Sequence, residues 1–293
     1  MIVGLVGLGR MGGAFGRVLL SKGFNLVVYD VVRDKVNEFV KLGATGASSP
    51  ADLASRVDIV LTNVPRSEDV LDVYLGGNGI LSGAKPGLIA VETSTTDIKT
   101  KLRVAEECRR RNVGFIVAML GKTVPQAERG ETPLFVGGPE EVFRDKRVQE
   151  VFQAISSGRI YYMRTIEAAV AFKLITNSMG FAQLLTFLEG LLFIQKFGIS
   201  IEEFLEAARD TAAYNYWFDA RREKILKEDY SAYFSIDYII KDLMYTLEEA
   251  KELGCPLPAT ALALQYYVAA KGMGYGGEDG IALIKLLRES CKK

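Results

Sequence analysis

Short apolar runs and amphipathic stretches alternate through the first 164 residues of the chain. The apolar runs are bounded by glycine or polar residues, and they predict strands at 1–6, 25–29, 57–62, 88–91, 113–117, 134–136 and 160–163. Several of the stretches between them carry the helical period, and Ser49-Pro50 predicts an N-cap and a first-turn proline for a short helix. Strands that alternate with helices are typical of a parallel sheet with right-handed crossover connections. Residues 1–164 therefore predict a doubly wound, mostly parallel α/β domain.

Beyond residue 164 the pattern is helical only, which predicts an all-α second domain over residues 165–293. Its first element is a long apolar run, 165–197, which Gly198 is expected to end, and Ser200 with Glu203 predicts a capping box for the next helix. Further helices are expected at 214–227, 235–253, 258–271 and 279–290. The run is long enough to cross a bilayer, but four polar residues are spread along it: Lys173, Asn177, Gln183 and Glu189. We therefore expect a buried core helix that joins the two domains, and no membrane.

A glycine-rich turn follows the first predicted strand and opens the first predicted helix. It reads Gly7-Leu8-Gly9-Arg10-Met11-Gly12, and an acid, Asp30, follows the second strand. This arrangement is typical of a Rossmann dinucleotide site, in which the helix amino terminus holds the pyrophosphate and the acid binds the adenosine ribose. Val31 and Val32 follow Asp30, so the sequence favours NAD, whereas Arg33 leaves NADP possible.

Two further strand ends are expected to line the cofactor, because ligands bind at the carboxyl edge of such sheets. Asn63-Val64-Pro65 follows the strand at 57–62. Ser94 and Thr95 follow the strand at 88–91, and either residue could contact the nicotinamide or cap the next helix.

The overall composition excludes several classes of function. Thirty-six basic and thirty-six acidic residues cancel, so no net field favours nucleic acid. The chain has no histidine, which excludes Ser-His-Asp and Cys-His catalysis and argues against a metal site. Its three cysteines form no paired motif, so we expect a reducing, cytoplasmic setting. Proton transfer is left to lysine, tyrosine, a carboxylate or water.

Lys173 and Asn177 lie four residues apart in the long apolar run, and therefore on one face of the predicted helix. A lysine among apolar neighbours either extends its ammonium to water or has a chemical role. The residues around it decide between these two readings.

Five motifs in order resemble the β-hydroxyacid dehydrogenase family, the 3-hydroxyisobutyrate dehydrogenase-like proteins. They are the GLGxMG-like opening at 7–12, a D-x-S-T-like segment at 92–95, a substrate-loop segment from Phe115 to Gly138, a K-x-x-x-N helix motif at 173–177, and an F…KDL-like element at 234–243. The resemblance covers nearly the whole chain. It implies a Rossmann domain followed by a helical domain for substrate binding and dimerisation.

The resemblance also implies roles for individual residues. Lys173 matches the catalytic lysine, which relays the proton of the substrate hydroxyl, and Asn177 matches the asparagine that holds the substrate. Lys241 matches a lysine beside the cofactor, and Asp242 matches an acid that supports the site. The resemblance further implies a homodimer or homotetramer. The alternative for Lys241 and Asp242 is a solvated charge pair on a helix.

The substrate loop departs from the family pattern. The family motif usually reads D-A-P-V-S-G-G, whereas residues 117–123 of this chain read V-A-M-L-G-K-T. The last three positions of the motif are therefore Gly121, Lys122 and Thr123. These three residues are still expected to contact the substrate, with Lys122 or Thr123 as a replacement for the lost anion contacts. The alternative for Lys122 is a solvent-facing loop charge without a role in binding. The specific 3-hydroxyisobutyrate assignment therefore stays open.

The prediction is an NAD(P)-dependent oxidoreductase that acts on a small hydroxy acid or the related aldehyde, with Lys173 as the proton relay. Two alternatives stay open. One is a non-catalytic NAD-binding sensor or scaffold of the same fold. The other is an imine reductase-type enzyme, although such enzymes place another residue where this chain has Lys173.

Overall fold

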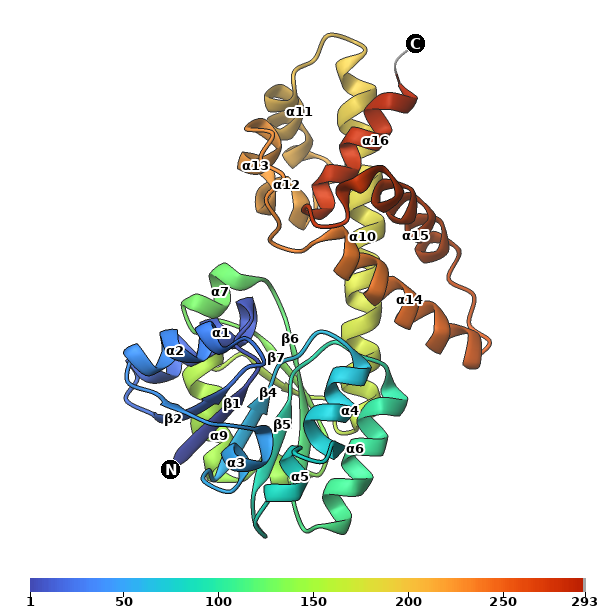
Figure 1. Cartoon of the computed structure of the whole chain (residues 1–293). Coiled ribbons are helices and arrows are strands. Elements are labelled where there is room, and N and C mark those ends of the chain that lie inside the picture. The colour runs from blue at the N-terminus through green and yellow to red at the C-terminus, as the bar shows by residue number, and fades with distance from the viewer. Residues whose placement is uncertain (292–293) are drawn as a thin grey trace. The chain divides into compact units, whose positions relative to one another are not determined.

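The computed structural model describes residues 1–291, which form two compact units, and an eight-stranded sheet is the centre of the first unit, Met1–Lys173 (Figure 1). The strands are β1 (Ile2–Val6), β2 (Asn25–Tyr29), β3 (Thr45–Gly46), β4 (Ile59–Thr62), β5 (Ile89–Glu92), β6 (Gly114–Leu120), β7 (Leu134–Gly137) and β8 (Ile160–Tyr162). Their order across the sheet is β3-β2-β1-β4-β5-β6-β7-β8. All neighbours pair in parallel except β6 and β7, so the predicted doubly wound, mostly parallel sheet is confirmed.

Nine helices of this unit connect the strands. They are α1 (Arg10–Ser21), α2 (Arg33–Lys41), α3 (Pro50–Ala54), α4 (Ser67–Leu75), α5 (Ile80–Gly83), α6 (Ile98–Arg110), α7 (Val124–Glu128), α8 (Glu140–Phe143) and α9 (Lys146–Ser156). The predicted N-cap of α3 is confirmed, because the Ser49 hydroxyl accepts a hydrogen bond from Asp52 N.

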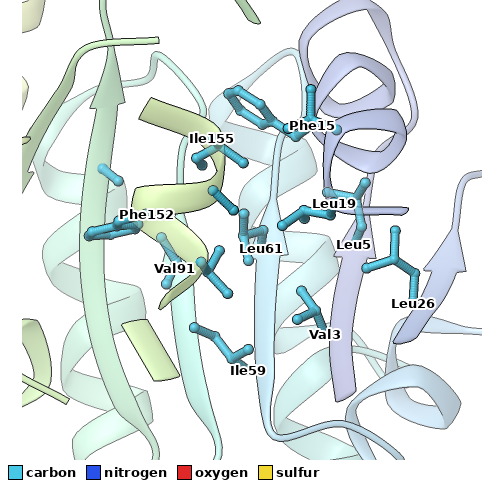
Figure 2. Packing of buried hydrophobic residues seen from close by; sticks show 14 of the residues in the cluster. Val3, Leu5, Phe15, Leu19, Leu26, Ile59, Leu61, Val91, Phe152 and Ile155 are labelled. Carbon is cyan, nitrogen blue, oxygen red and sulfur yellow. The ribbon is translucent and has the colours of Figure 1, made fainter. Parts of the chain in front are cut away.

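The main core of the first unit lies between one face of the sheet and helices α1, α2 and α9 (Figure 2). Leu5 and Leu61 project from neighbouring strands against Phe15 of α1 and Phe152 of α9. Alternate strand residues point to the opposite face of the sheet. There the Phe115 ring packs edge-to-face against Tyr74 of α4, with 5.8 Å between the ring centroids. Apolar residues on both faces are what a sheet covered by helices on both sides requires.

The strand order reverses between β1 and β4, which are neighbours although two strands separate them in sequence. At such a switch point the connections leave the carboxyl ends of the two strands in opposite directions, and this opens a crevice for ligands. The glycine turn after β1 and the Asn63-Val64-Pro65 turn after β4 are at this point.

The long helix α10 (Ile166–Gln195) begins in the first unit and continues into the second, which starts at Leu174. The predicted helix is confirmed, and Gly198 follows its end in a left-handed conformation, with φ of 79°. Only one face is buried: Phe181, Leu184 and Leu188 pack into the core of the second unit, whereas Met179 and Phe193 are exposed. Its length and composition alone would allow it to cross a bilayer, but a core helix passes the same test.

The second unit is helical, as predicted. After α10 it contains α11 (Ile201–Ala207), η1 (Ala208–Asp210), α12 (Tyr216–Ala220), α13 (Arg222–Leu226), α14 (Ile236–Glu252), α15 (Pro258–Ala270), the π-helical turn η2 (Lys271–Tyr275), η3 (Gly280–Ala282) and α16 (Leu283–Ser290). The Ser200–Glu203 capping box predicted at the start of α11 is confirmed. The predicted final helix divides into η3 and α16.

The helix predicted over 214–227 is wrong in one respect, because it is broken into α12 and α13 at Arg221. The Arg221 guanidinium is buried, donates to Asp279 Oδ1 at 3.1 Å and lies over the rings of Trp217 and Tyr233. Asp279 is far away in sequence, so no local pattern could have indicated this break.

Candidate functional site

The glycine turn after β1 is shaped by two close backbone approaches. Gly7 has φ of 92°, and a Cβ atom there would collide with the carbonyl oxygen of Asn63. A Cβ atom on Gly12 would collide with the carbonyl oxygen of Gly7. Gly9, in contrast, faces open space, with no atom within 4 Å of where its Cβ would be. The turn is therefore packed tightly on the protein side and open on the side where a ligand would approach.

The amino end of α1 provides an anion site beside this open position. Gly9 is the N-cap residue, and no side chain within residues 1–291 caps the helix there. The first turn contains no acid that would repel a phosphate. Uncapped N–H groups and the helix dipole together favour a negatively charged group. Gly7 to Gly12, including Leu8, Arg10 and Met11, thus fits the pyrophosphate of a dinucleotide.

Asp30 lies at the end of β2, where the sequence predicted a ribose ligand, but its carboxylate also supports the glycine turn. Asp30 Oδ2 accepts from Leu8 N at 2.7 Å, and Oδ1 accepts from Val32 N at 2.8 Å. Lys35 Nζ lies 3.7 Å from Oδ2. Each carboxylate oxygen can accept more than one hydrogen bond, so binding of ribose hydroxyls remains compatible with these contacts.

The turns after β4 and β5 are bonded into one surface. Asn63 Nδ2 donates to Thr93 Oγ1 at 2.9 Å, and Thr93 Oγ1 donates to Thr62 O at 2.7 Å. Val64 N donates to Ser94 Oγ at 2.9 Å. Because Asn63 also packs on Gly7, the three turns 7–12, 62–65 and 92–96 are contiguous, and we call them the cofactor bed.

Neither Ser94 nor Thr95 caps the helix that follows the bed. The N-cap of α6 is Asp97, which accepts from Thr100 N at 2.7 Å. Burial opposes its ionisation, but hydrogen bonds from Ser67 and Thr100 hold the pKa of Asp97 below its usual range. The capping alternative for Ser94 and Thr95 is therefore wrong. Ser94 is buried whereas Thr95 is half-buried, so Thr95 is the more accessible of the two for a cofactor contact.

A buried ion pair that was not predicted from the sequence lies beneath the cofactor bed. Glu92 ends β5, Lys101 lies in α6, and both side chains are fully buried and in direct contact. Val104 and Cys108 share the buried face of α6 with Lys101. A lysine at a core position of an amphipathic helix was the signal that could have revealed the pair.

In the substrate loop, residues 121–130, two backbone N–H groups donate to other groups of the protein. Gly121 N donates to Pro133 O at 2.8 Å, and Thr123 N donates to the Gln126 side chain at 3.3 Å. Between them, Lys122 is exposed and has φ of 63°, a left-handed conformation that favours glycine. A lysine thus occupies a backbone conformation suited to the glycine that the family pattern places there.

Lys173 lies next to this loop within the first unit. Its Nζ donates to the carbonyl oxygen of Leu120, the residue directly before Gly121, at 2.7 Å. A neutral carbonyl accepts from an ammonium and from a neutral amine alike, so this bond orients Nζ in both protonation states. The amine is therefore held at the start of the substrate loop.

In the second unit, Asn177, Asp242 and Lys241 form a connected set. Asn177 Nδ2 donates to Asp242 Oδ2 at 2.7 Å, and Lys241 Nζ lies 2.9 Å from Asp242 Oδ1. Asp242 is fully buried, so reading Lys241 and Asp242 as a solvated pair is wrong. Because a carboxylate only accepts hydrogen bonds, it fixes the Asn177 amide with its nitrogen toward Asp242 and its oxygen directed elsewhere.

Comparison with known families assigns both halves of the chain. The family model described as the NAD binding domain of 6-phosphogluconate dehydrogenase matches residues 2–166. The model described as NAD-binding of NADP-dependent 3-hydroxyisobutyrate dehydrogenase matches residues 168–287. The chain belongs to the β-hydroxyacid dehydrogenase family. It is an NAD(P)-dependent dehydrogenase that acts on CH–OH groups, as members of this family do.

Similar proteins of this family and its fold differ in the substrates they are named for. The 2-(hydroxymethyl)glutarate dehydrogenase of Eubacterium barkeri is 30% identical over 97% of this chain and 94% of its own. The crystal structure of a 3-hydroxyisobutyrate dehydrogenase from Salmonella typhimurium matches with a TM-score of 0.88, 26% identity and coverage of 98% and 99% of the two chains. An imine reductase from a Pseudomonas species shares the fold, with a TM-score of 0.63, 20% identity and coverage of 98% and 99%.

Proposed function

We propose that the protein catalyses the reversible NAD-dependent oxidation of a small β-hydroxy acid, similar to 3-hydroxyisobutyrate, to its semialdehyde, with Lys173 as the proton relay. Bound to the cofactor bed, NAD would supply the acceptor for the hydride of the hydroxyl-bearing carbon. Lys173 Nζ takes the proton of the hydroxyl as the C–O bond becomes a carbonyl, and then passes it to water. Reduction of the semialdehyde reverses both transfers.

The observation that carries this proposal is the bond from Lys173 Nζ to the Leu120 carbonyl. It holds the amine beside the substrate loop, within reach of a hydroxyl bound there. General acid–base catalysis needs a group that is positioned in both protonation states. This chain has no histidine that could act as the general base. Lys173 is supported in that role by its position beside the substrate loop.

We propose that the substrate carboxylate is bound chiefly by the Lys122 ammonium. Gly121 and Thr123 shape the loop, but their N–H groups are bonded to Pro133 and Gln126. The family resemblance assigns Asn177 to the substrate as well, and Asp242 holds its amide nitrogen and leaves its amide oxygen available. A charge-assisted contact from a side chain thus replaces hydrogen bonds from the loop backbone.

For the cofactor, we propose that Asp30 favours NAD over NADP, because its carboxylate would repel a 2′-phosphate. Asn63, Val64, Pro65 and Thr95 would line the dinucleotide on the cofactor bed. Lys241 is assigned to the cofactor only by the family resemblance.

The deciding experiment replaces Lys173 with methionine, which keeps the length of the stem and removes the amine. We expect kcat to fall by at least ~100-fold, the usual contribution of general acid–base catalysis, while NAD still binds. Activity is followed as NADH absorbance with a panel of hydroxy acids, semialdehydes and sugar acids.

Lys22→Met is the matched control. Lys22 Nζ also donates to a backbone carbonyl of the first unit, that of Ala154, at 2.6 Å. We expect the control to lower stability without changing kcat. Equal turnover in the parent and Lys173→Met would reject the role of Lys173.

The same panel tests the alternatives. A non-catalytic sensor would bind NAD tightly and turn over none of the acids or aldehydes. An imine reductase would reduce cyclic imines in preference to carbonyl compounds. The retained lysine and its position beside the substrate loop favour the dehydrogenase.

We further propose a homodimer or homotetramer in the cytoplasm. The exposed apolar residues Met179, Phe193 and Phe197, on α10 and just after it, support an assembly of copies through the second unit. Light scattering after size-exclusion chromatography tests this, and a monomer at micromolar concentration would contradict it.

A further inference from the structure

The Glu92–Lys101 pair is unusual for the first unit because neither side chain reaches water. Two charges lose much hydration free energy when they are buried, and their mutual attraction often fails to return all of it. Apolar residues of similar volume would often stabilise a fold equally well. Stability alone therefore does not explain why these two charges are buried here. The hydrogen bonds of the pair suggest another role.

Both members of the pair form hydrogen bonds with the backbone of Ser94. Glu92 Oε1 accepts from Ser94 N at 2.9 Å, and Lys101 Nζ donates to Ser94 O at 2.6 Å. The Ser94 hydroxyl accepts from Val64 N. All three polar groups of Ser94 are thus fixed, two by the ion pair and one by the turn after β4.

The fixed residue lies inside the cofactor bed. Thr93, next to Ser94, is bonded to Thr62 and Asn63, and Asn63 packs against Gly7 of the glycine turn. A rotation of the Ser94 peptide would therefore disturb the turns after β4 and β5 together. It would also displace Thr95, the residue of this segment placed for a cofactor contact.

We propose that Glu92 and Lys101 are positioning residues for the cofactor. They hold the 93–95 turn in its binding conformation before the cofactor arrives, so that no binding free energy is spent on ordering it. This inference rests on the proposed use of the cofactor bed, but not on the identity of the substrate.

The test is the double variant Glu92→Gln/Lys101→Met, which removes both charges at similar volume. No unpaired charge is left buried, so we expect the unfolding midpoint to stay within a few degrees of the parent's or to rise. We expect the Kd for NAD, measured by calorimetry, to increase ~10-fold, because the Ser94 carbonyl loses its charged donor. The KM for the acid substrate should stay within twofold of the parent's.

The matched control is Arg221→Met/Asp279→Asn, which removes the buried ion pair of the second unit. Because Asp279 also accepts from the backbone N–H groups of Tyr233 and Phe234, we expect this control to lower stability, and we expect it to leave the Kd for NAD within twofold. A folded Glu92→Gln/Lys101→Met variant with the parent's Kd for NAD would overturn the proposal. A parent that binds NAD but turns over no substrate would reject the proposed function alone, since the calorimetry still tests the pair.

If the double variant does not fold, hydrogen exchange of the parent protein tests whether the 93–95 turn is already ordered before NAD binds. We expect the amides of residues 93–95 to exchange slowly without NAD and to change little when NAD is added. Fast exchange that slows only on NAD binding would show that the turn is not fixed in advance, and would overturn the proposal.

Discussion

The cofactor bed and the substrate loop lie in the same unit but offer different groups to a bound anion. In the bed, glycines stand where the backbone approaches closely, as at Gly7 and Gly12, and the amino end of α1 is left uncapped. In the substrate loop, a left-handed position is occupied by Lys122, and the N–H groups of Gly121 and Thr123 are bonded within the protein.

The difference indicates which part of the site is generic and which part is particular to this protein. Backbone N–H groups and a helix dipole suit any dinucleotide pyrophosphate, so the bed can keep one form across many substrates. A lysine side chain places its charge further from the backbone than an N–H group does. In the proposed role of Lys122, the substrate anion would therefore lie further from the loop backbone than an anion bound by N–H groups.

The largest expected effect concerns two glycines of the bed. Gly7→Ala should lower the free energy of unfolding by about 2 kcal/mol or more, because the Cβ meets Asn63 at a positive φ. Gly9→Ala should change it by less than about 0.5 kcal/mol, since its φ is −66° and its surroundings are open. Both variants should weaken NAD binding by ~100-fold, about 2.7 kcal/mol, because each alters the approach to the pyrophosphate. Urea unfolding and calorimetry measure the two quantities. Normal NAD binding by Gly9→Ala would place the pyrophosphate elsewhere.

A somewhat smaller effect is expected at Lys122 in the substrate loop. Lys122→Gly should raise the KM for the acid substrate by roughly 30-fold, the cost of losing a charge-assisted contact. Stability should not fall, because glycine adopts φ of 63° without strain. Asn112→Gly is the control, since Asn112 is exposed and also left-handed, with φ of 55°. It should leave KM unchanged, and an equal KM in both variants would remove Lys122 from substrate binding.

The smallest effect should come from Asp30, which has a part in both cofactor choice and the shape of the bed. Asp30→Ala should weaken both cofactors, because Leu8 N loses its acceptor. The loss should be larger for NAD, so the ratio of kcat/KM for NAD to that for NADP should fall by ~10-fold, about 1.4 kcal/mol. An unchanged ratio of kcat/KM for the two cofactors would mean that Asp30 supports the glycine turn and does not bind the adenosine ribose.

A thiol titration gives an independent check on the packing of the first unit. Burial, the main cause, raises the pKa of Cys108 to about 12, whereas Cys255 and Cys291 are exposed. At pH 8 we expect a disulfide reagent to label the two exposed thiols quickly and Cys108 only in denaturant. Rapid labelling of three thiols in the native protein would contradict the buried position of α6.

The sequence by itself determined the features that depend on local pattern. The alternation of strands and helices, the glycine turn with Asp30, and the helix that carries Lys173 and Asn177 all follow from periodicity and from backbone conformations that few residues adopt. These signals are local, because neighbouring residues along the chain carry them.

Only the tertiary structure decided the features that join distant residues. Lys101 lies under Ser94 because α6 packs on the sheet, Asp242 orients Asn177 across 65 positions, and Arg221 breaks a predicted helix to reach Asp279. A buried charge or amide has to find its partner wherever the fold brings one. Such partners leave no periodic trace in the sequence, so the chemistry could be named from the residues while its geometry could not.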